Sequence, residues 1–136
     1  MTAPNTVLTG TGLINDAVFT YDRRLSAVRR YVEANLSLYV SAEIAAETLG
    51  LTRNYFSTFF RRTTGVTFGR WVTSLRVERA RRLIETTNKP ILKIGFAVGF
   101  RDNRTFQRAF KRFTGLTPSQ YGSSVRRAWP QAASNA

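Results

Sequence analysis

The stretch Ile91–Tyr121, ILKIGFAVGFRDNRTFQRAFKRFTGLTPSQY, decides the fold that we expect for this chain. It holds a short apolar segment, a turn at Gly99, a segment with many cationic side chains, and a new helix start at Thr117 and Pro118. Two short helices joined around a glycine are typical of a helix-turn-helix, whose second helix can enter a DNA major groove. The stretch therefore predicts a DNA-binding unit.

An earlier segment repeats this pattern at a nearly constant offset. The shared residues are Phe56, Phe60, Gly65 and Thr67 in the first copy and Phe106, Phe110, Gly115 and Thr117 in the second. Members of each pair lie 50 positions apart (106 − 56 = 50). The turn segments 49–51 and 98–100 match at an offset of 49 (98 − 49 = 49), so the second turn has one extra residue. Such a repeat implies two copies of one structural unit.

The charge of the chain favours nucleic acid as its partner. The 136 residues include 21 Lys and Arg against 8 Asp and Glu, which gives a net charge of +13. Nearly all the cations are arginines, because Lys89, Lys93 and Lys111 are the lysines of the chain. The planar fork of arginine pairs with phosphates and guanine edges in two-point geometry. This favours a nucleic acid over an anionic membrane surface or a merely solubilising charge.

The residue types that are absent exclude several function classes. The sequence has no cysteine and no histidine, which removes thiolate sites, histidine acid–base catalysis and most zinc chemistry. The acidic residues are scattered, so we expect no enzyme, no metal site, no cofactor and no small-molecule site in this chain. No apolar run approaches the length of about eighteen residues that a membrane span needs. We expect a cytoplasmic, nucleoid-associated protein.

Hydrophobic periodicity predicts an all-α chain of about seven helices. Asp22, Ser41, Thr52, Thr67 and Asp102 are expected to cap helices. The expected parts are a flexible arm at 1–20, a first helix-turn-helix subdomain at 21–66, a linker helix at 67–87, a second subdomain at 88–125 and a flexible tail at 126–136. Arginines, among them Arg76, fill the polar side of the linker helix, which should act as a stiff spacer.

In each predicted recognition helix, phenylalanines face inward and polar side chains face outward. The outward residues are Arg53, Asn54, Ser57, Thr58 and Arg61 in the first helix, and Asn103, Arg104, Gln107, Arg108 and Lys111 in the second. The second set suits base edges, because arginine reads guanine and asparagine or glutamine reads adenine. For each of these residues the plain alternative is an ordinary solvated helix face.

Three segments carry a resemblance to a known family: SAEIAAETLGLTRNYFSTFFRRTTGVTF, LRVERARRLI and KIGFAVGFRDNRTFQRAFKRFTGLTPSQY. From about Asp22 to Tyr121 the chain resembles the DNA-binding region of AraC/XylS-type bacterial transcription regulators. The resemblance implies two helix-turn-helix units joined by a long helix and bound to adjacent major-groove segments of promoter DNA. It also implies contact with RNA polymerase, usually in activation.

Carried over residue by residue, the resemblance places base contacts at Asn54, Ser57, Thr58, Asn103, Arg104, Gln107 and Arg108. Phosphate contacts are expected at Arg53, Arg61, Arg62, Lys111 and Arg112. Arg108 has a competing role as a phosphate contact. The short side chains of Ser57 and Thr58 suggest that the first unit is the less base-specific of the two.

Two points depart from the family pattern or stay open. Arg101 stands where the family generally has a small capping residue, so Asp102 is expected to take over that cap. Twenty residues before the first unit cannot hold an effector domain, so the chain is either a stand-alone regulator or the carboxy-terminal piece of a longer one. The alternative function is a sequence-neutral architectural or nucleoid-type DNA-binding protein, which would share the charge.

Overall fold

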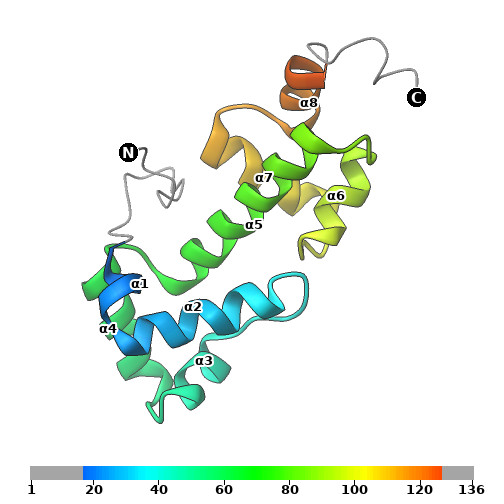
Figure 1. The fold of residues 1–136 in the computed structure, drawn as a ribbon. Helices are drawn as coiled ribbons and strands as arrows, with labels where there is room; N and C mark the ends of the chain where they lie inside the picture. Colours follow the sequence, from blue (N-terminus) through cyan, green and yellow to red (C-terminus); the bar gives the residue numbers. More distant parts are fainter. Residues whose placement is uncertain (1–16, 127–136) are drawn as a thin grey trace.

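The computed structural model describes residues 17–126, and in that range the chain forms α-helices without a β-strand (Figure 1). The helices are α1 (Val18–Tyr21), α2 (Arg23–Asn35), α3 (Ala42–Thr48), α4 (Arg53–Thr64), α5 (Phe68–Thr86), α6 (Ile91–Ala97), α7 (Asn103–Thr114) and α8 (Pro118–Arg126). The expectation of an all-α fold is confirmed. The pairs α3–α4 and α6–α7 are the two helix-turn-helix units.

Side chains cap the helices where the sequence predicts them. The amides of Ile44, Tyr55, Arg70 and Thr105 donate to the side chains of Ser41, Thr52, Thr67 and Asp102, at 3.0, 3.2, 3.2 and 2.7 Å. Each bond satisfies an amide that has no partner inside its helix. Asp102 does take over the cap of α7, next to Arg101.

The two units repeat one another in detail. Gly65 and Gly115 end α4 and α7 in left-handed conformations, with φ of 93° and 88°, which glycine adopts without a side-chain penalty. The Thr64 hydroxyl lies 2.8 Å from the Phe60 carbonyl, and the Thr114 hydroxyl lies 2.7 Å from the Phe110 carbonyl. The structure therefore confirms the duplication that the sequence offset predicts.

Helix α5 contributes to two separate hydrophobic cores. Its amino-terminal half buries Phe68, Trp71 and Val72 with α1–α4, and its carboxy-terminal half buries Val77, Ala80 and Ile84 with α6–α8. In Figure 1 it runs diagonally between the two groups of helices. The predicted spacer therefore also forms part of the hydrophobic core of each unit. At roughly 1.5 Å per residue, its 19 residues span about 28 Å.

The prediction of a flexible arm at residues 1–20 is wrong for its last three residues, which belong to α1. Val18 and Phe19 are buried, and the Phe19 ring stacks on Trp71 with centroids 4.9 Å apart. Two adjacent apolar residues show no helical period in the sequence, but together they cover one side of the first core. The first unit therefore begins before residue 21, and residues 1–16 of the expected arm lie outside the described range.

The expected tail is also wrong at its first residue. Arg126 is the last residue of α8, and its guanidinium donates to the Ile84 carbonyl at 3.1 Å and to the Lys89 carbonyl at 2.9 Å. These bonds fasten α8 to the segment that follows α5. Residues 127–136 of the expected tail lie outside the described range.

Candidate nucleic-acid interface

Helix α4 presents a polar face to solvent and an aromatic face to the first core. Asn54, Ser57 and Thr58 are exposed, as are Arg61 and Arg62 in the last turn. On the opposite side, Phe56, Phe59 and Phe60 are buried. The predicted base-contacting residues of the first unit therefore lie together on an accessible helix face.

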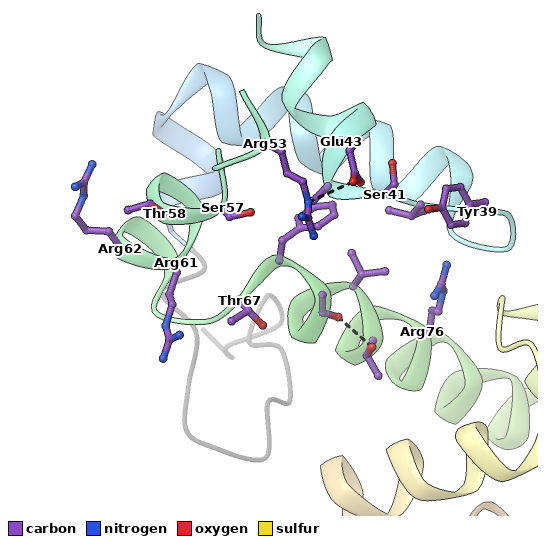
Figure 2. A pocket seen from close by; sticks show the side chains of 16 residues that line it. Tyr39, Ser41, Glu43, Arg53, Ser57, Thr58, Arg61, Arg62, Thr67 and Arg76 are labelled. Atoms are coloured by element: carbon purple, nitrogen blue, oxygen red, sulfur yellow. Dashed lines mark hydrogen bonds and ion pairs between the residues drawn. The ribbon is translucent and has the colours of Figure 1, made fainter. Parts of the chain in front are cut away.

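A groove of about 920 Å³ borders this face of α4. Ser57, Thr58 and Arg61 line one side of it, and Thr67 and the residues after it at the start of α5 line another (Figure 2). Gly69 and Thr73, which also line the groove, were not predicted as site residues. A Cβ on Gly69 would have no atom within 4 Å, so packing does not require a glycine there. A glycine inside a predicted helix, where it costs about 1 kcal/mol relative to alanine, is the sequence feature that could have drawn attention to this position.

Among the predicted phosphate contacts, Arg53 forms an ion pair with another residue of the protein. Its Nε lies 3.4 Å from Oε2 of Glu43 on α3, and both side chains are more than half exposed (Figure 2). An ion pair in solvent contributes only about 0–1 kcal/mol. A phosphate can therefore replace Glu43 as the partner of Arg53 at small cost.

Helix α7 repeats the arrangement with longer polar side chains. Arg104, Gln107 and Arg108 are exposed and Asn103 is half-buried, whereas the face toward the second core buries four apolar side chains. Those buried residues are Phe106, Ala109, Phe110 and Phe113. The four predicted base-contacting residues of the second unit thus stand on the first two turns of one helix.

The start of α7 is held by a charged cap. The amide and the hydroxyl of Thr105 both bond to the Asp102 carboxylate, at 2.7 and 3.1 Å. These hydrogen bonds, first that of the Thr105 amide, hold the pKa of Asp102 below its usual value of 3.8. The carboxylate is therefore ionised at neutral pH and fixes the first turn, from which Asn103 and Arg104 project.

Both recognition helices end in a pair of cations. Arg61 and Arg62 close α4, and Lys111 and Arg112 close α7, all four exposed. Cations there also interact favourably with the negative end of the helix dipole. Of the twelve predicted contact residues, none is buried, and all of them lie on α4 or α7.

The described residues show no membrane or metal feature. Across residues 17–126, no helix combines the length and apolar character that crossing a bilayer requires. In the same range, no group of three or more His, Cys, Asp and Glu side chains is placed to hold a metal ion.

Comparison with known proteins places the chain in a family. A helix-turn-helix domain model matches residues 45–124. The raffinose operon transcriptional regulatory protein RafR of Pediococcus pentosaceus is 33% identical over 95 residues, which cover 70% of this chain and 34% of that protein. The transposon Tn10 TetD protein of Escherichia coli is 30% identical over 113 residues, which cover 79% of this chain and 82% of TetD.

A solved structure extends the likeness to the fold. The DNA-binding domain of AdpA, a global transcriptional factor crystallised with a target DNA, matches with a TM-score of 0.73 and 28% identity. That match covers 79% of this chain and 97% of the AdpA domain. The chain spans about a third of the length of most curated regulators that it matches.

RafR is a regulator of an operon and the AdpA structure is a DNA-binding domain, and neither supports an enzyme or the architectural alternative. Their shared region coincides with the two helix-turn-helix units and α5. The chain therefore belongs to the AraC-type family of helix-turn-helix DNA-binding domains of bacterial transcription regulators.

Proposed function

We propose that this chain regulates transcription by binding one promoter sequence with α4 and α7 in two successive segments of the major groove. The observation that supports this most directly is the duplicated helix, capped alike, buried by phenylalanines on one face and polar on the other. A helix of about 28 Å between the units approaches the ~34 Å that separates successive major-groove faces on one side of DNA.

Base reading is proposed for the exposed polar faces. Arg104 and Arg108 suit guanine, and Gln107 and Asn103 suit adenine, because each of these side chains can make a two-point contact with that base. Asn54, Ser57 and Thr58 would read the other half of the site. The shorter hydroxyl side chains of α4 offer fewer such contacts, so α7 should contribute more to sequence preference.

Backbone binding is proposed for the cations that border these faces. Arg61 and Arg62 lie at the end of α4 beside the groove, and Lys111 and Arg112 occupy the corresponding end of α7. Arg53 would exchange Glu43 for a phosphate. With a net charge of +13, binding should release several counterions and weaken steeply with salt.

The family resemblance also supports two further parts of the proposal. Contact with RNA polymerase at the promoter would make the protein an activator. A protein with this role would work in the cytoplasm, at the nucleoid.

Selection of bound sites from a random duplex pool tests the proposal. We expect one enriched site with two short conserved blocks about one helical turn apart. The affinity for that site should exceed the affinity for random duplex by about a thousandfold or more at physiological salt. Equal affinity for both duplexes would instead establish a sequence-neutral protein.

A further inference from the structure

Arg76, in the middle of α5, lines the groove beside α4 and also joins α5 to the loop between α2 and α3. Its Nε donates to the Leu36 carbonyl, and its Nη2 donates to the Leu38 carbonyl, both at 3.0 Å. Leu36 and Leu38 belong to the loop between α2 and α3, some 40 residues earlier in the chain. In Figure 2 the Arg76 side chain extends from α5 toward the segment that carries Tyr39.

The turn of the second helix-turn-helix meets the same loop. Gly99 has φ of +110°, and a Cβ added to it would stand 2.3 Å from the Leu36 carbonyl oxygen and 2.7 Å from Nε of Arg76. The backbone of the α6–α7 turn thus lies directly against both partners of this hydrogen bond. Figure 1 shows the loop after α2 and the end of α6 side by side next to the middle of α5.

Beside this junction, the surfaces of the two units are separated by a groove. The buried apolar residues form one cluster in each unit, and α5 belongs to both clusters. Beside Arg76, a groove of about 450 Å³ separates Leu38 and Tyr39 from Phe96 and Phe100. Besides α5, where Arg70 lies 5.8 Å from the Phe113 ring of α7, the first unit meets the second where Leu36 and Arg76 approach Gly99.

The chemistry of this junction requires arginine. The fixed fork of a guanidinium reaches two carbonyl oxygens at once, whereas a lysine ammonium is a single point charge on a flexible stem. Burial lowers the pKa of Arg76, in keeping with a guanidinium partly withdrawn from water. Paired with two carbonyls, this side chain is less available to DNA than the exposed arginines of α4 and α7.

We propose that Arg76, together with Gly99, is a positioning residue that fixes the angle between the two recognition helices and so selects the spacing of the two half-sites. The proposal rests on the proposed function, since a spacing preference requires two helices that read DNA together. In this proposal Arg76 does not contact a base. A looser junction would let each unit bind its own half-site at more than one relative rotation.

A distance measurement on the free protein tests the junction without DNA. The sequence has no cysteine, so two introduced cysteines would carry the only spin labels. Suitable exposed positions are Glu47→Cys on α3 and Ser119→Cys on α8. We expect a narrow distance distribution in the labelled parent and a broader one in Arg76→Lys, which keeps the charge. Arg79→Lys, an exposed position one turn along α5, is the matched control and should not change it.

A second variant approaches the junction from the other side. Gly99→Ala places a methyl group against the Leu36 carbonyl and Arg76, so it should shift the mean distance between the labels. Circular dichroism would verify that the variants retain their helices. Distributions identical to that of the parent in both folded variants would overturn the proposal, and Gly99→Ala still decides it if Arg76→Lys fails to fold.

Binding to a spacing series tests the consequence for recognition. Inserting or deleting one base pair between the half-sites rotates them by roughly 35°. We expect the parent to lose about tenfold or more in affinity and Arg76→Lys to lose less than about threefold, since loss of joint engagement removes the gain from linkage. Affinity for random duplex should stay equal between the two proteins.

The outcomes separate the two proposals. If the parent shows no sequence preference, the proposed function fails, and the label distances still decide the role of Arg76. If the parent prefers one spacing and Arg76→Lys prefers it as strongly, the positioning role is overturned while the proposed function stands.

Discussion

The ring of Phe106 on α7 lies against the backbone of Gly95 on α6, where an added Cβ would stand 2.5 Å from Cδ2 of the ring and 2.8 Å from Cγ. Both residues are buried. The corresponding residue of the first unit is Ala46, at the offset of 49 (95 − 49 = 46), and it is also buried. Gly95 therefore lets the Phe106 ring pack directly on the backbone of α6, at a position where the first unit has an alanine.

Gly95→Ala should destabilise the second unit. Alanine gains about 1 kcal/mol in helix propensity over glycine, but forcing a methyl group into a packed core costs about 1–3 kcal/mol. The ring of Phe106 packs on Phe100 and Phe110, which limits its movement. We expect a net loss of about 1 kcal/mol in urea unfolding. Gly69→Ala, which meets open space, is the control, and a Gly95→Ala protein more stable than its parent would contradict the packing argument.

Arg104→Ala and Gln107→Ala should each lower affinity for the selected site by about 1–3 kcal/mol and relax the preference in one half of it. The loss arises because a base edge is left without its partner. Competition binding with single-base variants of the site measures the relaxation. Ser119→Ala on α8 serves as an exposed control. Equal losses on specific and random duplex would reassign these residues to backbone contact.

Arg62→Ala should weaken binding to all duplexes alike. It removes one of the cations at the end of α4, and each phosphate contact contributes about 0.9 to the slope of log affinity against log salt. We expect the slope to fall by about 1 in titrations over a range of salt. Arg79→Ala removes the same charge from the exposed side of α5 and should change the slope less. Equal slopes for the parent and Arg62→Ala would show that Arg62 does not contact a phosphate.

Acid should weaken the start of α7. The Thr105 amide holds the pKa of Asp102 below 3.8 in the folded chain, so the stability from this carboxylate is present above 3.8 and is lost as the pH falls through the folded value. Asp102→Asn keeps an acceptor for the cap but does not titrate there. The stability difference between parent and variant should therefore shrink in unfolding curves as the pH falls through 3.8 and then through the lower folded pKa. A constant difference would show that the carboxylate does not act through its charge.

Tyr121→Phe should loosen α8 from α5. The Tyr121 hydroxyl bonds to Glu85, and Arg81 bonds to the same carboxylate at 2.6 Å and also to Glu78. Loss of one such hydrogen bond costs about 1 kcal/mol. Burial, and then the bond to Glu85, raise the pKa of Tyr121, so the difference from the variant should persist at neutral pH and shrink as the pH rises above 10.0. Chemical unfolding at several pH values measures it, with Tyr21→Phe as an exposed control.

Local signals in the sequence predicted the duplicated part of the fold. Ser41, Thr52, Thr67 and Asp102 cap helices through bonds to amides three residues ahead, so the sequence pattern alone locates those helix starts. The repeat likewise predicted which faces of α4 and α7 are buried, because a helix face follows from residue spacing. The expected contact residues lie on the exposed faces, and their roles in DNA binding stay predictions.

Features that depend on distant partners escaped prediction. Val18 and Phe19 are buried in the first core, where the Phe19 ring stacks on Trp71, 52 positions later in the chain (71 − 19 = 52). Arg76 was expected on the polar side of α5, but its partners are two backbone carbonyls of the loop after α2. A carbonyl exists at every residue, so nothing in the sequence distinguishes the two that Arg76 contacts.

The sharing of α5 limits how this domain can be divided. Trp71 and Val77 stand six residues apart on one helix, yet each closes a different core (77 − 71 = 6). A break between them would leave each core covered by half a helix that ends beside it. Val77, Ala80 and Ile84 of α5 pack against the second helix-turn-helix unit. A hybrid that takes this unit from another family member must therefore also take the matching half of α5, so the two units are best exchanged as a pair.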